Sequence, residues 1–212
     1  MKRFFALFAP LALAGCSVFG QSDVETAPYE LVEAVADKNI EVRNYSSLIL
    51  VSTPMNAGEN SAFRRLFNYI SGANTSSEEI AMTAPVFMNE GGEREKDGEK
   101  IAMTAPVFMG QGEQNMMSFV MPSHFTLQTT PQPTNPDVRI SEVTDYKVAV
   151  ITFSGTLSES NVRENTQKLN AWLASSNYTA TGPAIEAAYN GPMTLPMFRR
   201  NEIMVPVKFN SD

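Results

Sequence analysis

The chain has 212 residues, a formal net charge of -7, 43% hydrophobic residues, a single cysteine and a single histidine. This length suits one domain with a substantial buried core. The acidic balance and the lack of a basic cluster after the N-terminus argue against a nucleic-acid partner. One histidine cannot build a His cluster for metal hydrolysis, and one cysteine cannot form an intrachain disulfide.

The first fifteen residues are laid out like a secretory signal peptide. Lys2 and Arg3 precede an apolar run, residues 4–14, that is too short to span a bilayer as a stable helix. The sequence "LAGC" that ends at Cys16 resembles the bacterial lipobox. The resemblance implies cleavage before Cys16 and acyl chains that anchor the protein to a membrane. We therefore expect a lipoprotein of the bacterial cell envelope, and Ser17 is compatible with an outer-membrane location facing the periplasm. The alternative is an unmodified thiol in an ordinary cleaved signal.

The expected organisation has three parts. Residues 1–15 are the lipoprotein signal peptide, residues 16–28 are the lipidated cysteine with a flexible tether, and residues 29–210 form one folded domain. The tether is small, polar and aperiodic in sequence. Once the signal peptide is removed, 14 basic and 23 acidic residues remain, a net charge of -9.

The first half of the domain predicts strands followed by a helix. Residues 29–53 alternate between apolar and polar and predict a hairpin or a pair of strands that ends at Pro54. The period then changes, with Asn60 as the expected N-cap and Gly72 as the expected C-terminal stop of a helix. Its apolar stripe recurs at i, i+3, i+4 and i+7: Phe63, Leu66, Phe67 and Ile70.

The second half repeats this order with different residues. A helix is predicted with Asn161 and Glu164 as a capping box. Its apolar stripe contains Val162, Leu169, Trp172 and Leu173. The strand-like segments are 138–142, 148–153, 181–190 and 202–209. Two units of strands, helix and strands predict an α+β fold, a curved antiparallel sheet or barrel with two flanking helices.

Nine residues, "IAMTAPVFM", occur identically at 80–88 and 101–109, and a polar segment separates the copies. Pro85 and Pro106 lack a backbone N–H, which places each copy at a sheet edge or a bulge. The expected structure is one added, edge-associated hairpin with a solvated tip. The first copy is either the extra one or the usual strand followed by an inserted hairpin. Because the copies are identical, a register switch between them is an alternative.

This region is also rich in thioether side chains, which are ligands for soft ions such as Cu(I). The alternative, which the wide spacing favours, is that these methionines fill an irregular apolar core. The residues concerned are Met82, Met88, Met103, Met109, Met116, Met117 and Met121.

Five blocks of sequence in a fixed order resemble the SOUL haem-binding protein family. They are "EVRNY", "FNYISGAN", "IAMTAPV", "SFVMPS" and "YNGPMTLPMFRRNEIMVPV". The resemblance covers nearly the whole domain. It implies a pseudo-twofold distorted antiparallel β-barrel with two flanking α-helices, and non-covalent binding of haem or a related tetrapyrrole or other hydrophobic small molecule. It also implies a fold shared with bacterial effector-binding domains.

Haem needs an apolar groove, cations for its propionates and, optionally, an axial ligand. Phe63 and Phe67 would supply the groove, Arg64 or Arg65 the cation, and His124 the axial ligand. For each there is a simpler interpretation: core phenylalanines, solvated arginines and a histidine on a surface turn.

No enzyme is predicted, because the chain lacks a G-x-S-x-G turn and a phosphate-binding Gly-rich loop with Lys, and its cysteine is used for lipidation. The alternative function is a non-enzymatic envelope scaffold whose loop 89–100 contacts an unknown protein partner. A ligand-binding protein would have an open apolar site with an arginine at its rim, whereas a scaffold would have a closed core and an exposed apolar patch.

Overall fold

The computed structural model describes residues 25–76, 80, 83–89, 115–191 and 193–210. Cys16, the second copy of the repeat at 101–109 and the expected contact loop 89–100, apart from its first residue, lie outside the described residues. Within the described part no helix is long and apolar enough to cross a membrane.

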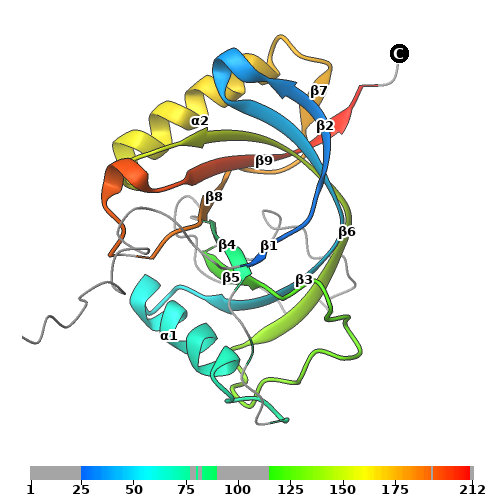
Figure 1. Ribbon diagram of the computed structural model, residues 1–212, viewed down its shortest axis with the longest axis vertical. Helices are drawn as coiled ribbons and strands as arrows, with labels where there is room; N and C mark the ends of the chain where they lie inside the picture. The colour runs from blue at the N-terminus through cyan, green and yellow to red at the C-terminus, as the bar shows by residue number, and fades with distance from the viewer. Residues whose placement is uncertain (1–24, 77–79, 81–82, 90–114, 192, 211–212) are drawn as a thin grey trace, which may run out of the picture.

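Six antiparallel strands pair in a closed circle and form a barrel (Figure 1). In order around the barrel they are β3 (Ile40–Pro54), β6 (Arg139–Phe153), β9 (Asn201–Phe209), β8 (Ile185–Ala188), β4 (Thr83–Asn89) and β5 (Met116–Val120). Strand β5 then pairs with β3 and closes the circle. The predicted α+β class, a distorted antiparallel barrel with two helices, is confirmed.

The long pair β3 and β6 forms the middle of the barrel, with pairing that extends from Ile40 opposite Ile151 to Ser52 opposite Arg139. The sequence predicted two separate strands in place of β6. The polar stretch that suggested a break, Glu142 to Asp145, is exposed except for Val143. It keeps its pairing with β3 as far as Thr144, whereas Asp145 has φ of 49° and interrupts the regular register. The alternation was therefore that of a strand with one solvated face, not that of a loop.

Three further strands extend the sheet. Strand β2 (Glu30–Val35) pairs with β3 through the turn η1 (Ala36–Lys38), which confirms the first predicted hairpin. Strand β7 (Tyr178–Ala180) pairs with β9. Strand β1 (Glu25–Thr26) runs parallel to β4, and Ala27 beside it is buried. The folded domain thus begins before residue 29, because part of the expected tether pairs with the barrel.

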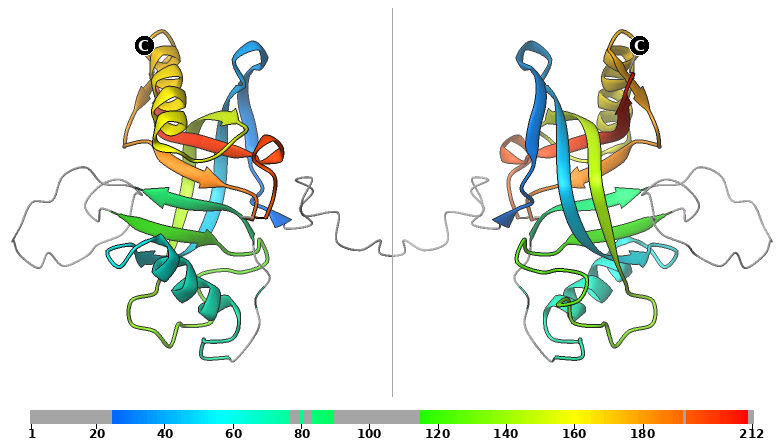
Figure 2. Two further views of the ribbon diagram at one scale, coloured as in Figure 1. Left: turned by 90° about the vertical axis from the view of Figure 1, so that its left-hand side faces the viewer. Right: turned by 90° about the vertical axis from the view of Figure 1, so that its right-hand side faces the viewer.

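Two helices pack on opposite sides of the barrel, α1 (Glu59–Ile70) and α2 (Glu159–Leu173), and the side views in Figure 2 show the same separation. The N-cap of α1 is Gly58 rather than Asn60, and Gly72 follows its end with φ of 105°, as a C-terminal stop requires. The cap of α2 is Ser158, whose side chain accepts a hydrogen bond from the Asn161 backbone N–H at 3.4 Å.

Three clusters of buried side chains form the core. One fills the barrel interior, a second lies between α1 and the strands β3 and β5, and a third lies between α2 and the strands β6 and β9. The predicted stripe of α2 is confirmed, since Leu169, Trp172 and Leu173 are buried and Val162 packs against the same cluster.

The first copy of the repeat occupies a place between β5 and β8, so it is paired on both sides and is not at a sheet edge. Pro85 lies instead at a bulge, the second of the two expected positions, because the register with β5 shifts between Thr83 and Val86. The interpretation of this copy as the usual strand, followed by an insertion, agrees with its place beside β5.

Candidate ligand-binding site

Helix α1 presents two phenylalanines to solvent. Its buried residues are Ala62, Leu66, Tyr69 and Ile70, whereas Phe63 and Phe67 are 40% and 45% exposed. The sequence placed both phenylalanines on the core stripe. The helix is rotated away from that orientation because Tyr69 enters the core and its hydroxyl donates to the Pro131 carbonyl oxygen at 2.7 Å.

The two rings form one apolar surface together with the barrel. Phe63 and Phe67 are stacked with centroids 6.0 Å apart, and Phe63 meets the buried Phe119 of β5 edge-on at 5.5 Å. Phe119 is paired with Val86 of β4, and Val86 and Met88 are partly buried against the same core cluster. The result is a half-exposed aromatic and aliphatic surface along α1 and β4, of the kind that a flat apolar ligand covers.

The two arginines of α1 differ in whether they have hydrogen-bond partners. Arg65 donates from Nε to Thr53 Oγ1 at 2.8 Å and from Nη2 to the Pro54 carbonyl oxygen, so it holds the helix to the end of β3. Arg64 is exposed and has no hydrogen-bond or ion-pair partner among the described residues. Arg64 is thus the cation available to an anionic group lying on the phenylalanine surface.

His124 is exposed after β5, and its ring lies 4.3 Å from that of Phe125. Phe125 packs against the core cluster beneath α1. The neighbouring Ser123 backbone N–H donates to Glu25 Oε1 at 3.0 Å and ties this turn to β1. Hydrogen bonds from the Ser123 side chain and backbone lower the pKa of Glu25. Among the described ring contacts, His124 meets Phe125, Phe63 meets Phe67 and Phe119, and none joins His124 to the phenylalanines of α1.

A second exposed apolar segment precedes β9 and was not predicted. It surrounds the turn η2 (Pro196–Phe198), which lies beside the start of α2 in Figure 1, and the Gly155 backbone N–H donates to the Pro196 carbonyl oxygen at 2.8 Å. Its large apolar side chains are exposed: Met193 at 78%, Leu195 at 41%, Met197 at 67% and Phe198 at 43%. The sequence does contain these apolar residues close to two prolines, but there they indicated only the resemblance to the family.

A buried charge cluster lies at the barrel wall, and sequence reasoning missed it. Arg43 of β3 and Glu202 of β9 are almost fully buried and make a two-bond ion pair, with N to O distances of 2.9 and 3.0 Å. Arg200 Nη2 donates to Glu202 Oε1 at 2.7 Å, and the Tyr189 hydroxyl donates to Glu202 Oε2 at 2.6 Å. The arginines also stack on rings, Arg43 over Tyr29 at 4.5 Å and Arg200 over Tyr189 at 4.2 Å.

The partners of Glu202 determine its charge. Burial alone would raise its pKa, but the hydrogen bonds and positive charges of Arg43 and Arg200 hold that pKa below its ordinary value. Burial would lower the pKa of Arg43, and the attraction of Glu202 more than reverses this. Glu202 is therefore an ionised structural anion with all of its charge matched.

Within the described part, no contact brings the predicted methionine ligands together at one point. Met117 and Met121 are buried in the cluster beneath α1, where they fill space between Phe119 and the helix. Met88 and Met116 are partly buried. The other three predicted thioether ligands, Met82, Met103 and Met109, lie outside the described residues. No group of three or more His, Cys, Asp or Glu side chains in the described part is placed to hold a metal ion.

The fold belongs to the class of α+β proteins built on a closed antiparallel barrel with two covering helices. A family model described as SOUL heme-binding protein matches residues 24–206, and the chain belongs to that family. A search of curated proteins finds no match.

Solved structures share the fold at low sequence identity. The C-terminal domain of EcmrR is 11% identical with a TM-score of 0.52, and the match covers 85% of this chain and 98% of that one. An uncharacterised conserved protein from Listeria innocua is 11% identical with a TM-score of 0.55, over 81% and 93% of the two chains. A Listeria innocua protein described as a hydrolase is 10% identical with a TM-score of 0.53, over 81% and 92%.

Proposed function

We propose that this protein binds haem or a related tetrapyrrole non-covalently on the outer surface formed by α1 and β4. The observation that carries the proposal is the stacked pair Phe63 and Phe67, which is half exposed although it continues the apolar core. Membership of the SOUL family supports a tetrapyrrole as the ligand. The barrel interior is filled by its own buried side chains, so a ligand site would lie outside it. A closed core with an exposed apolar patch also fits the alternative, an envelope scaffold, and the haemin titration below distinguishes the two functions.

The apolar ring and the anionic propionates of the ligand would contact different side chains of this surface. A porphyrin ring is flat and apolar and would lie on the phenylalanines, where burial of aromatic area contributes most of the affinity. Its propionates are anionic and would face Arg64, while Arg65 positions the helix. His124 is the candidate axial ligand, since its neighbour Phe125 packs against the core beneath the same helix.

Haemin titration of the full chain in detergent, followed in the Soret band, tests the apolar surface. We expect saturable one-to-one binding that weakens about tenfold in Phe63→Ala, which corresponds to about 1.4 kcal/mol. The control is Phe209→Ala, because Phe209 is also an exposed phenylalanine, at 54% against 40% for Phe63, but lies at the end of β9. Equal binding by the two variants, or a spectrum like that of haemin with an unrelated acidic protein, would exclude this surface.

The same titration tests Arg64 and His124 by two different measurements, the affinity and the position of the Soret maximum. Arg64→Ala should weaken binding several-fold, and Arg163→Ala is its control because Arg163 is an exposed arginine on α2. His124→Ala should shift the Soret maximum if His124 ligates the iron. An unchanged maximum would remove His124 from the site and leave the phenylalanine surface in place.

We also propose that the protein is a lipoprotein of the bacterial envelope, anchored through Cys16 and without catalytic activity. The support is the lipobox-like "LAGC" after a signal-like start. In a bacterial host, the wild-type chain should incorporate labelled palmitate and sediment with membranes, and Cys16→Ser should lose both properties. Label retained in Cys16→Ser would contradict the anchor.

A further inference from the structure

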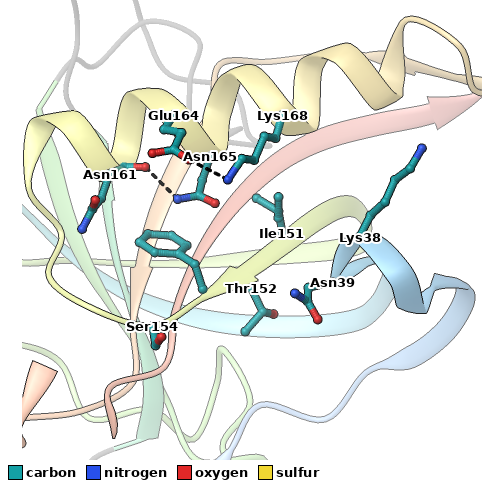
Figure 3. A pocket seen from close by; sticks show the side chains of 10 residues that line it. Lys38, Asn39, Ile151, Thr152, Ser154, Asn161, Glu164, Asn165 and Lys168 are labelled. Atoms are coloured by element: carbon teal, nitrogen blue, oxygen red, sulfur yellow. Dashed lines mark hydrogen bonds and ion pairs between the residues drawn. The ribbon is translucent and has the colours of Figure 1, made fainter. Parts of the chain in front are cut away.

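A cavity of about 390 Å³ lies on the α2 side of the barrel, away from the phenylalanine surface of α1. It is open to solvent and is bordered by α2, by the end of β6 and by the turn η1 with Asn39 (Figure 3). Its size is within the range of small-molecule sites, about 300–1,000 Å³. Unlike a typical apolar site it is lined mainly by polar side chains, so its ligand must be hydrophilic.

Two carboxamides on α2 offer acceptor oxygens to this cavity. Asn165 is buried, and its Nδ2 donates to the Asn161 backbone oxygen at 2.8 Å. The Asn161 Nδ2 in turn donates to the Thr156 carbonyl oxygen at 2.9 Å. Both amide nitrogens are thus occupied, while neither Oδ1 has a partner among the described residues. Free carboxamide oxygens are suited to accept hydrogen bonds from ligand hydroxyl groups.

The cavity has one unmatched positive charge. Lys168 is paired with Glu164, with Nζ 2.7 Å from Oε1, so these two charges cancel. Lys38 lies on the other side of the cavity from Asn161 in Figure 3 and has no ion-pair partner in the described part of the chain. Asn39 follows it and adds a third carboxamide. The lining as a whole therefore suits a ligand with one negative charge.

Phe153 and Ile151 add the only apolar part of the lining. Phe153 is partly buried against the core beneath α2. The accessible part of this phenyl ring gives the apolar C–H face of a pyranose a surface to lie on, while the hydroxyl groups at the edge of the sugar reach the carboxamides.

We propose that this cavity binds an acidic monosaccharide, a uronate, whose hydroxyl groups donate to Asn161 and Asn165 and whose carboxylate pairs with Lys38. Ring, hydroxyls and a single charge each have a counterpart in the lining. The site is separate from the surface on α1, and the two ligands bind independently.

Saturation-transfer difference NMR with D-glucuronate tests the proposal, using the full chain in dodecylphosphocholine, a detergent without a sugar head group. We expect saturable binding of D-glucuronate. D-Glucose, which has the ring without the charge, and acetate, which has the charge without the ring, should each bind about tenfold more weakly, the effect of about 1.4 kcal/mol. Acetate binding as strongly as D-glucuronate, or no saturation transfer at all, would overturn the proposal.

Two variants test the residues without disturbing the fold. Lys38→Ala removes the exposed cation and should reduce D-glucuronate binding to the level of D-glucose. Asn39→Gly removes only the carboxamide, because Asn39 has φ of 53°, which glycine adopts readily, and should weaken binding several-fold. Lys208→Ala, an exposed lysine on β9, should bind as the wild type does. Unchanged binding in Lys38→Ala would overturn the assignment.

Discussion

Buried polar side chains in the barrel differ in whether they have hydrogen-bond partners. Glu202 has four side-chain donors: Arg43, Arg200 and Tyr189 at 3.0 Å or less, and Thr152 at 3.3 Å. The hydroxyl of Tyr146 is buried in the same barrel and has no hydrogen-bond partner among the described residues. A matched buried charge stabilises one geometry, whereas an unmatched buried hydroxyl costs free energy.

Removing the Tyr146 hydroxyl should therefore stabilise the fold. We expect Tyr146→Phe to raise the free energy of unfolding by about 1 kcal/mol, because an orphaned polar atom leaves the core. Tyr69→Phe is the matched control and should lower it by about 1 kcal/mol, because the Tyr69 hydroxyl donates to Pro131 at 2.7 Å. Urea unfolding measures both, and a loss of stability in Tyr146→Phe would show that its hydroxyl has a partner.

Neutralising the buried acid should be costly. Glu202→Gln removes the buried counter-charge of Arg43 and leaves it only the partly exposed Glu41, so we expect it to lower the free energy of unfolding by about 3 kcal/mol. Glu164→Gln removes an acid of a fully solvated pair on α2 and should leave stability unchanged. Equal effects of the two substitutions would show that the buried cluster is not a determinant of stability.

At the scale of elements, each helix covers its own core cluster on one side of the barrel. Both predicted helices exist, yet α1 is rotated so that Tyr69 is buried and Phe67 is half exposed. Its apolar residues extend over more than one face, so periodicity alone did not decide which face meets the barrel. The exposed remainder of that apolar surface is the candidate site.

Substitutions can test which copy of the repeat occupies the place of strand β4. Phe87 is buried in the barrel interior, and its counterpart in the second copy is Phe108. We expect Phe87→Ala to lower the free energy of unfolding by about 3–5 kcal/mol, because it leaves a cavity in the core. Phe108→Ala should leave stability unchanged, since the first copy fills the place between β5 and β8. Two mild single variants with a severe double variant would instead show that the copies exchange.

At the scale of the whole molecule, closing the barrel makes its stability depend on pH through Glu202. Its pKa is held below the ordinary carboxyl value, so the unfolded chain binds the proton more readily than the folded protein. The stabilisation is present above the unfolded pKa of about 4.3 and is lost as the pH falls through the lower folded pKa.

Urea unfolding at pH values between 7 and 3 measures this dependence. The wild type should lose stability progressively below about pH 4.3. Glu202→Gln should show a smaller loss over the same interval, because the titrating group is gone. Parallel curves for the two proteins would assign the acid sensitivity to other carboxylates.

The site was predicted in part. Residue types and spacing indicated Phe63, Phe67 and Arg64 as candidate ligand contacts, and the structure places them together on one helix surface. The cavity beneath α2 was not predicted, because Lys38 and Asn161 are far apart in sequence and neither belongs to a recognisable motif. Likewise, nothing local in "EVRNY" or "RRNE" indicated that Arg43 and Glu202 form an ion pair.

The sequence by itself determined what depends on short-range patterns. The strands of the first hairpin, the existence of two amphipathic helices, the α+β class and the family all follow from alternation, helical period and ordered motifs. Tertiary structure alone decided that the first copy of the repeat joins β5 to β8, which face of α1 is exposed, and that Arg43 meets Glu202. These outcomes depend on closure of the barrel, which brings together residues up to 159 positions apart, and a local pattern carries no information about such contacts.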